Sequence, residues 1–245
     1  MKKISDYPTK PPKKAEKSDF KKPMKELLNQ LEDLQYLMQA EEKHSLLVVL
    51  QGMDASGKDG ITKKVFGACS PGGIQVHSFK KPTDLEFAHD FLWRVHQKVP
   101  RKGQITVFNR SHYEDVLIQR VHGWISEEHA NKRIAAINAF EDLLAFDNQT
   151  TVLKFFLNVS KDQQKIELQQ RIDEPDKQWK HNEGDWKERE HWDKYMRCYE
   201  ALLNNCTTPW NVIPMDERWY GQYLIAEKLV ETLSGFNMEF PKLEQ

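Results

Sequence analysis

Short apolar segments recur along the chain, separated by longer stretches in which apolar residues follow helical spacing. The apolar segments predict strands at 45–50, 73–79, 104–108, 151–158 and 211–215. The third and fourth of these are apolar nearly throughout, as is typical of a parallel strand covered on both faces. The helical spacing predicts helices at 24–42, 57–68, 83–99, 112–122, 127–146, 161–171, 187–204 and 217–234. This alternation of strands and helices predicts an α/β fold, with a parallel sheet and helices on both faces.

The length of 245 residues favours one α/β domain with an arm or a lid over two independent domains. Residues 1–25 contain nine lysines, three acidic residues and four prolines, so this segment alone buries little surface. It is expected to be either an extended arm lying across the body or a neighbouring subunit, or a disordered solubilising tail. We therefore expect a basic arm and helix at 1–44, followed by the main domain at 45–245.

The composition argues against two classes of binding partner, nucleic acids and membranes. The net charge of −1 argues against a basic nucleic-acid-binding protein, so no nucleic-acid partner is expected. The longest apolar runs have the length of strands, so no membrane partner is expected, and the N-terminus lacks the apolar core of a signal peptide. Cys69, Cys198 and Cys206 are too scattered for a disulfide framework. A cytoplasmic protein is therefore expected.

The stretch from Gly52 to Gly60, which reads GMDASGKDG, follows the first predicted strand and opens the next helix. It matches the G-x-x-x-x-G-K pattern of a phosphate-binding loop, in which backbone N–H groups and a lysine, here Lys58, contact phosphates. The positive end of the following helix dipole favours the same anion. The alternative is a chance glycine turn before a core helix. The candidate phosphate-binding residues of the loop are Gly52, Ala55, Ser56, Gly57, Lys58, Asp59 and Gly60.

Two carboxylates distinguish this loop from the usual one. Asp59 stands where a magnesium-binding Ser or Thr is typical, and Asp54 lies inside the loop. An acidic group repels phosphate unless a cation lies between them, so the loop predicts metal-bridged phosphate chemistry. Lys58 is expected to be a solvated side chain.

The second candidate segment is FNRSHYED at 108–115, directly after the third predicted strand. Ligands of open α/β sheets bind at the carboxyl ends of strands, so Asn109 and Arg110 are expected beside the phosphate loop. Arg110 could neutralise a transferring phosphoryl group through paired N–H donors. The alternative is an exposed arginine at a strand end. Asn109 brings no charge, so Glu114 or Asp115 could supply the missing carboxylate.

The third segment, at 171–186, contains Pro175 and Gly184 between two helical stretches and gathers basic and tryptophan side chains. Such a segment can close over phosphates as a lid, here placed at about 171–190. The alternative is a solvated charged loop whose tryptophans cap the core. A basic path around the loop predicts a groove that holds more negative charge than one triphosphate. Its candidate members are Lys80, Lys81, Arg120, Lys177 and Lys180, with Lys63 and Lys64 nearby.

The segments 52–60, 108–116 and 171–186 together resemble the three signature segments of the second family of polyphosphate kinases. The run HDFLWRVH at 89–96 and the pair Val99-Pro100 also resemble that family. The resemblance covers roughly residues 20–235, and the three segments occur at the family's spacing.

The resemblance implies a thymidylate-kinase-like P-loop kinase fold with a helical lid. It implies Mg²⁺-dependent transfer of a terminal phosphoryl group between inorganic polyphosphate and a nucleotide, with Mn²⁺ as an alternative metal. The family's pattern implies that Asp54 binds metal or acceptor phosphate and that Lys58 binds phosphate. It implies that Arg110 and Arg171 stabilise the transferring group.

Asn109 departs from the family's pattern, because many members carry Asp at this position. The variant FNRSHYED resembles a subgroup that phosphorylates nucleoside mono- and diphosphates, which implies AMP, ADP, GMP and GDP as purine acceptors. We assign the metal to Asp54 and Asp115, while Asn109, Glu114 and Asp115 all stay open as the residue that completes its site.

Two other functions stay open at this stage. One is an ATP-dependent kinase of a nucleotide or small molecule on the same fold, and the other is a non-catalytic polyphosphate-binding protein. Asp59 in place of the usual hydroxyl mildly favours polyphosphate over ATP, and the presence of Lys58 and Arg110 disfavours a binding protein. A homodimer or homotetramer is expected, and a net charge near zero together with the amphipathic helices predicted at 127–146 and 187–204 permits such an assembly.

Overall fold

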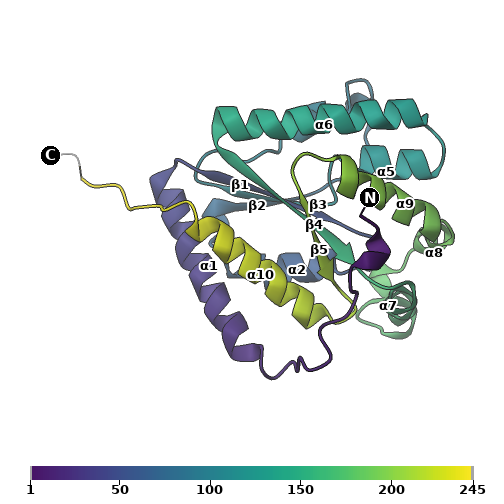
Figure 1. Ribbon diagram of the computed structural model, residues 1–245, viewed down its shortest axis with the longest axis horizontal. Helices are drawn as coiled ribbons and strands as arrows, with labels where there is room; N and C mark the ends of the chain where they lie inside the picture. Colours follow the sequence, from purple (N-terminus) through teal and green to yellow (C-terminus); the bar gives the residue numbers. More distant parts are fainter. Residues whose placement is uncertain (1, 244–245) are drawn as a thin grey trace.

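The computed structural model describes residues 2–243 and contains a five-stranded sheet in the order β2-β3-β1-β4-β5 (Figure 1). All neighbouring strands are parallel. The strands are β1 (Ser45–Gln51), β2 (Ile74–Ser78), β3 (Ile105–Asn109), β4 (Thr150–Asn158) and β5 (Trp210–Pro214). Each lies within one residue of its predicted bounds, so the predicted parallel sheet is confirmed.

Helices cover both faces of the sheet (Figure 1). One face carries α1 (Lys21–Glu41), α2 (Lys58–Lys64) and α10 (Arg218–Ser234), and the other carries α5 (Glu114–Val121), α6 (Glu127–Asn148) and α9 (Trp192–Asn205). The segments α7 (Lys161–Asp173) and α8 (Glu183–Glu190) project beyond the carboxyl end of the sheet. Two short helices, α3 (Asp84–Phe87) and α4 (Trp93–His96), connect β2 to β3. One-turn 3₁₀ helices occur at Ile4–Asp6, Phe66–Ala68, Pro71–Gly73 and Gln178–Lys180.

Two predicted helices are each divided in the structure. The predicted helix at 83–99 consists of α3 and α4, because the Asp90 side chain accepts a hydrogen bond from the Leu92 N–H (2.9 Å). Such local side-chain bonds compete with helical ones. The predicted helix at 187–204 breaks at His191, whose backbone (φ −88°, ψ 15°) leaves the helical region and separates α8 from α9.

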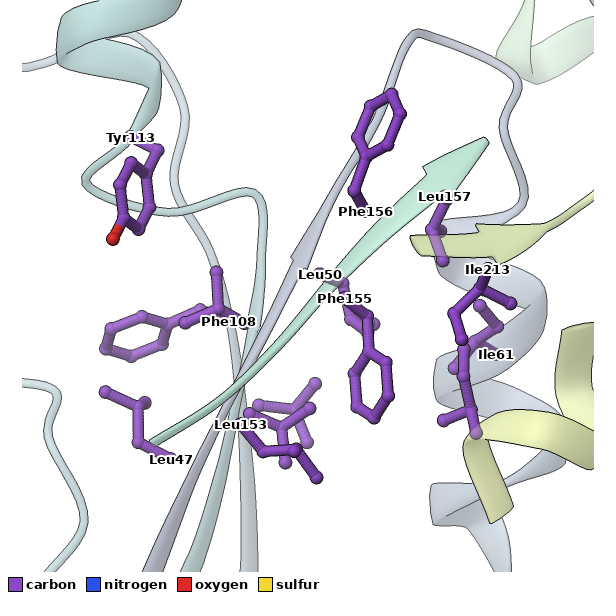
Figure 2. Close-up of a cluster of buried hydrophobic side chains, with 14 of the residues drawn as sticks. Leu47, Leu50, Ile61, Phe108, Tyr113, Leu153, Phe155, Phe156, Leu157 and Ile213 are labelled. Carbon is purple, nitrogen blue, oxygen red and sulfur yellow. The ribbon is translucent and has the colours of Figure 1, made fainter. Parts of the chain in front are cut away.

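The core lies along the central strands, as Figure 2 shows for a cluster of side chains from β1, β3, β4, β5 and α2. Every residue of β1 is buried, and so is every residue of β3. Both faces of these strands are covered, which accounts for their continuous apolar sequences. The carboxyl ends of β1 and β3 therefore lie side by side at one edge of the buried sheet, with Leu50 paired in register with Asn109.

The N-terminal arm lies across the body of the protein (Figure 1). Asn158, at the end of β4, donates to the carbonyls of Tyr7 and Pro8 (3.3 and 3.2 Å). Ile4 is buried, and its N–H donates to Glu200 on α9 (3.0 Å). Because α1 also contributes buried side chains to the common core, the division at 44/45 stays a prediction.

None of the helices in residues 2–243 is both long enough and apolar enough to cross a membrane.

Candidate active site

The phosphate loop runs from the end of β1 to the start of α2. Gly57 precedes α2 with φ +107°, a backbone conformation that disfavours other residues. A Cβ on Gly52 would lie 2.9 Å from the backbone oxygen of Leu157, so this end of the loop also has no room for a side chain. The two glycines therefore let the loop turn tightly against β4 before the helix begins.

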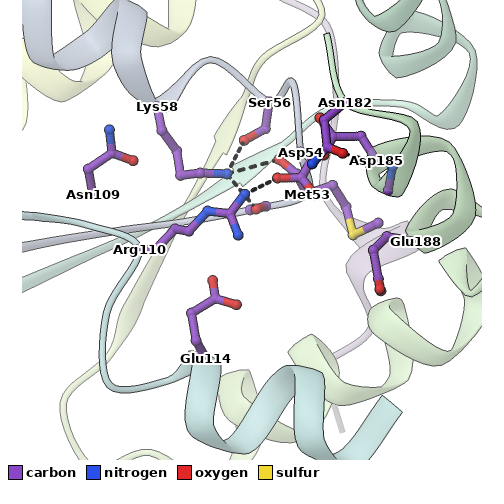
Figure 3. A network of polar contacts seen from close by, with 12 residues as sticks. Met53, Asp54, Ser56, Lys58, Asn109, Arg110, Glu114, Asn182, Asp185 and Glu188 are labelled. Carbon is purple, nitrogen blue, oxygen red and sulfur yellow. Dashed lines mark hydrogen bonds and ion pairs between the residues drawn. The ribbon is translucent and has the colours of Figure 1, made fainter. Parts of the chain in front are cut away.

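Lys58 turns inward at the first residue of α2 (Figure 3). Its Nζ donates to the carbonyls of Gly52 (2.7 Å) and Met53 (3.0 Å) and to Ser56 Oγ (3.4 Å). The side chain is buried, so the expectation of a solvated lysine is wrong. Burial lowers its pKa to about 8 with help from the charge of Arg110, and the charge of Asp54 opposes this shift.

Arg110 follows β3 directly and pairs with Asp54 across the mouth of the loop (Figure 3). Its φ of +62° is unusual for a residue with a side chain, and its N–H donates to the Leu50 carbonyl (3.1 Å). Glu114 lies on the other side of the guanidinium and accepts from Gln51 (3.2 Å). Burial raises the pKa of Glu114, while the charges of Arg110 and Lys58 oppose this.

Asp59 connects the loop to the end of β3 and to the lid. It accepts from Asn109 Nδ2 (2.9 Å) and from Lys180 Nζ (3.0 Å). Burial raises its pKa, but these two hydrogen bonds and the lysine charge outweigh burial, so the net pKa is lowered. Asp59 therefore stays ionised in the position where a metal-binding hydroxyl is usual.

In the predicted lid, an ion pair between Arg171 Nη1 and Asp185 Oδ2 (2.6 Å) connects α7 to α8. Burial raises the pKa of Asp185, and the charge of Asp54 adds to this shift, whereas the charge of Arg171 opposes it. Lys177 pairs with Glu174 (2.6 Å) at the outer part of the segment. The lid and the phosphate loop enclose a cavity of about 820 Å³.

Most predicted site residues line this one cavity. They are Asp54, Ala55, Ser56, Gly57, Lys58, Asp59, Gly60, Asn109, Arg110, Arg171, Lys177 and Lys180.

Asp115 lies elsewhere, and its position does not agree with the prediction that it binds the metal. Its carboxylate is buried against Arg94 Nη2 (3.0 Å) and accepts from Gln119 (3.3 Å). Consecutive residues of a helix point about 100° apart, so only one of Glu114 and Asp115 can face the loop. That residue is Glu114.

Three basic residues of the predicted path also lie outside the cavity. Arg120 pairs with Glu127 and borders a separate cavity with Arg197. Lys80 and Lys81 are exposed after β2 and are absent from the cavity wall. The structure therefore does not support the predicted path along these lysines.

Several site residues were not predicted, and Arg218 and Gln164 are two that contact the phosphate loop directly. Arg218, at the start of α10, donates to the Ala55 carbonyl (2.6 Å) and pairs with Glu167 (2.9 Å). Its place after β5, at the carboxyl end of a parallel strand, is a signal that could have identified it. Gln164 on α7 donates to the Asp54 carbonyl (3.0 Å), and no sequence motif marks it.

The side chains that the structure describes do not form a complete metal site by themselves. Within residues 2–243, no three His, Cys, Asp or Glu side chains come together to hold a metal ion on their own. Mg²⁺ commonly uses one or two carboxylates together with substrate phosphates. Asp54 and Asp59, which flank Lys58 in the loop, fit a metal shared with phosphate oxygens. Together with Lys58 and Arg110, the arrangement suits phosphoryl transfer, which depends mainly on positioning and charge neutralisation.

Comparisons with known proteins agree with this geometry. The family model described as polyphosphate kinase 2 (PPK2) matches residues 14–241. An AMP/ADP-polyphosphate phosphotransferase of Meiothermus ruber is 50% identical over 221 residues, which cover 89% of this chain and 82% of that protein. An ADP-polyphosphate phosphotransferase of Rhodopseudomonas palustris is 38% identical over 255 residues, covering 98% and 88%.

A solved structure is similar in fold as well. The polyphosphate kinase 2 from Arthrobacter aurescens TC1 superposes with a TM-score of 0.91 at 42% identity, covering 94% of this chain and 84% of that one. The α/β P-loop kinase fold is thereby confirmed. The chain belongs to the polyphosphate kinase 2 family.

Proposed function

We propose that this protein is a Mg²⁺-dependent phosphotransferase that moves a terminal phosphoryl group between inorganic polyphosphate and nucleoside mono- or diphosphates. The observation that carries the proposal is the convergence of Lys58, Arg110 and Asp54 on one cavity between the loop and the lid. The names of the two relatives support polyphosphate with AMP and ADP. GMP and GDP are the other purine acceptors that we propose.

In the proposed reaction, a phosphate oxygen of the acceptor attacks the terminal phosphorus of polyphosphate. The bridging P–O bond breaks, and the shortened chain leaves with the electron pair on its terminal oxygen. Lys58 and the loop amides hold donor phosphates, and Arg110 neutralises charge on the transferring group. Because Arg110 now pairs with Asp54, binding would replace a carboxylate partner with a phosphoryl group.

Arg171 is proposed to act from the lid. Asp185 holds its guanidinium at the cavity wall, and Lys180 bridges the lid to Asp59 on the loop. A lid held in this way would exclude water from the transferring group, which suppresses hydrolysis. The lid bounds of about 171–190 remain part of this proposal.

A bound Mg²⁺ would neutralise charge on the phosphates, and Mn²⁺ could replace it. Asp54 and Asp59 are the proposed ligands, and Asn109 orients Asp59 by its hydrogen bond. Glu114, rather than Asp115, is the nearby carboxylate that could hold a metal-bound water.

The test is a matrix of donors and acceptors. Long-chain polyphosphate and ATP are each supplied as donor to AMP, ADP, GMP and GDP, with Mg²⁺, with Mn²⁺ or with chelator. The proposal expects metal-dependent transfer from polyphosphate. Transfer from ATP alone would identify an ATP-dependent kinase, and tight polyphosphate binding without transfer would identify a binding protein.

We further infer a cytoplasmic homodimer or homotetramer, without a nucleic-acid or membrane partner. Phe146 and Leu143 on α6 are 75% and 40% exposed, which supports an apolar contact between subunits. Light scattering after size-exclusion chromatography measures the subunit number. Phe146→Glu should dissociate the assembly if α6 forms the contact.

A further inference from the structure

A second cavity, of about 700 Å³, lies next to the first. Its walls come from the N-terminal arm, the start of α1, the end of α2, α7, the β5–α10 connection and the start of α10. Arg218 and Glu167 line both cavities, so their ion pair lies at the boundary between them. Because Arg218 also donates to the Ala55 carbonyl, this boundary stands directly against the phosphate loop.

Four lysines line the second cavity, namely Lys17, Lys21, Lys25 and Lys64. All four are exposed, and none forms an ion pair with a carboxylate in the part of the chain that the structure describes. Lys21 and Lys25 stand one helical turn apart on α1, so their ammonium groups follow one line along the wall. The cavity therefore carries unbalanced positive charge.

The acidic residues of the same cavity are already engaged. Asp216 accepts from Thr9 Oγ1 (2.9 Å) and from the Ser160 N–H (2.7 Å). Glu217 accepts from Trp219 Nε1 (3.1 Å). Glu167 is paired with Arg218. The carboxylates are thus partly satisfied by neutral donors and by Arg218, which leaves the lysines to act on an incoming anion.

We propose that this second cavity binds the distal part of the polyphosphate chain, several phosphates beyond the group held at Lys58. The proposal rests on the proposed function and gives the chain a path past Arg218, towards α1, in place of the predicted path along Lys80 and Lys81. Flexible lysines act as point charges without a fixed geometry. That property suits a repeating polyanion whose length and register vary.

The experiment compares two triple variants with the same loss of charge. Lys21→Gln/Lys25→Gln/Lys64→Gln changes the cavity, and Lys43→Gln/Lys98→Gln/Lys102→Gln changes three exposed lysines that border neither cavity. Steady-state constants are measured with long-chain polyphosphate and with tripolyphosphate as donor, at low and moderate salt. Since tripolyphosphate is too short to fill both cavities, only the long chain should use the second one.

We expect the cavity variant to raise the KM for long-chain polyphosphate roughly tenfold at low salt, since each exposed charge pair contributes modestly. Salt should reduce the difference. The KM for tripolyphosphate, the KM for nucleotide and kcat should change less than about twofold. The control variant should match the wild-type protein for every donor.

Three results would overturn the proposal: an unchanged KM for the long chain, an equal rise in the control variant, or a rise in the nucleotide KM alone. The last would mean that the cavity binds the nucleotide. If the wild-type protein transfers nothing from any polyphosphate, the proposed function fails instead. Calorimetric titration of long-chain polyphosphate then tests the cavity separately, and equal affinity of both variants would contradict it.

Discussion

Two buried lysines in this fold, Lys154 and Lys58, differ in their hydrogen-bond partners. Lys154, in the middle of β4, is fully buried and donates to Glu141 Oε2 and to the Tyr113 hydroxyl, each at 2.7 Å. Lys58, after the neighbouring strand β1, has two backbone carbonyls and a serine hydroxyl as hydrogen-bond partners. The charge of Lys154 is balanced inside the protein, whereas the hydrogen-bond partners of Lys58 within residues 2–243 are all neutral.

This difference in partners distinguishes Lys154, whose charge stabilises the fold, from Lys58, whose charge is available to a ligand. Burial raises the pKa of Glu141, but His112 and Lys154 outweigh it and keep this carboxylate ionised opposite Lys154. For Lys58, burial dominates and lowers the pKa to about 8. A buried ammonium without a bonded carboxylate is costly on its own and strongly attracts an anion. The comparison therefore predicts that Lys154 supports the fold and that Lys58 serves a phosphate ligand.

The largest expected effect is the loss of stability in Lys154→Met. This change leaves Glu141 buried without its cation, which should cost about 3–5 kcal/mol of unfolding free energy. Lys154→Met/Glu141→Leu should recover most of it, because both charges are then removed. Urea unfolding measures both variants. Equal stability of Lys154→Met and the wild-type protein would contradict a structural role for this pair.

Lys58→Ala should reduce activity without reducing stability, in contrast to Lys154→Met. Turnover with polyphosphate should fall roughly a hundredfold or more, as when one electrostatic contact to a transition state is removed. The unfolding free energy should stay the same or rise, because a desolvated charge is lost. Activity and urea unfolding are measured on the same preparation. A folded variant with near-normal turnover would remove Lys58 from the active site.

The two loop carboxylates should differ from each other. Asp54→Asn removes the negative charge that pairs with Arg110. Turnover should fall roughly tenfold or more, because a charged contact is lost. Asp59→Asn should cost less, because Asp59 is 66% exposed and already bonded to Asn109 and Lys180. Mg²⁺ titrations of both variants provide the test. If Asp59→Asn alone shifts the metal requirement, the two roles are reversed.

The smallest effect concerns pH. Lys58 must be protonated to bind phosphate, and its pKa lies at about 8, below the usual value of 10.5. Transfer measured as kcat/KM should therefore fall about tenfold between pH 7 and pH 9, because this constant reports the free enzyme. Lys58→Arg should lack that fall, since arginine does not lose its proton in this range.

The lowered pKa of Lys58 also makes the stability of the folded state depend on pH. A lysine whose pKa is lowered in the folded state destabilises that state fully below pH 8. The cost is relieved as pH rises from about 8 to 10.5. The difference in unfolding free energy between Lys58→Met and the wild-type protein should therefore shrink over this window. A constant difference would mean that Lys58 is not desolvated.

The sequence predicted the sheet and the phosphate loop well because their signals are local. Continuous apolar runs mark β1 and β3, and the glycines around Lys58 define the turn. The gathering of Lys58, Asn109 and Arg110 followed from the rule that parallel strands end at one edge.

Features that depend on tertiary contacts were not predictable. Glu114 and Asp115 are adjacent acids in the first turn of α5, and only the packing of Arg94 determines which one faces away from the loop. The inward turn of Lys58 depends on carbonyls whose orientation the sequence does not encode locally. The lysines of the second cavity belong to the N-terminal arm, α1 and α2, and only the folded chain shows that they meet beside Arg218.

The most direct test of the account is the titration of both lysines by NMR, with isotope-labelled lysine and assignment by Lys58→Arg and Lys154→Met/Glu141→Leu. The account predicts that Lys58 titrates at about pH 8 in the free protein and at a higher pH once tripolyphosphate is bound, because phosphate stabilises the ammonium. The Lys154 resonance should not respond to tripolyphosphate. A Lys58 titration that is unaffected by tripolyphosphate, with Lys154 responding instead, would contradict the assignment of the two charges.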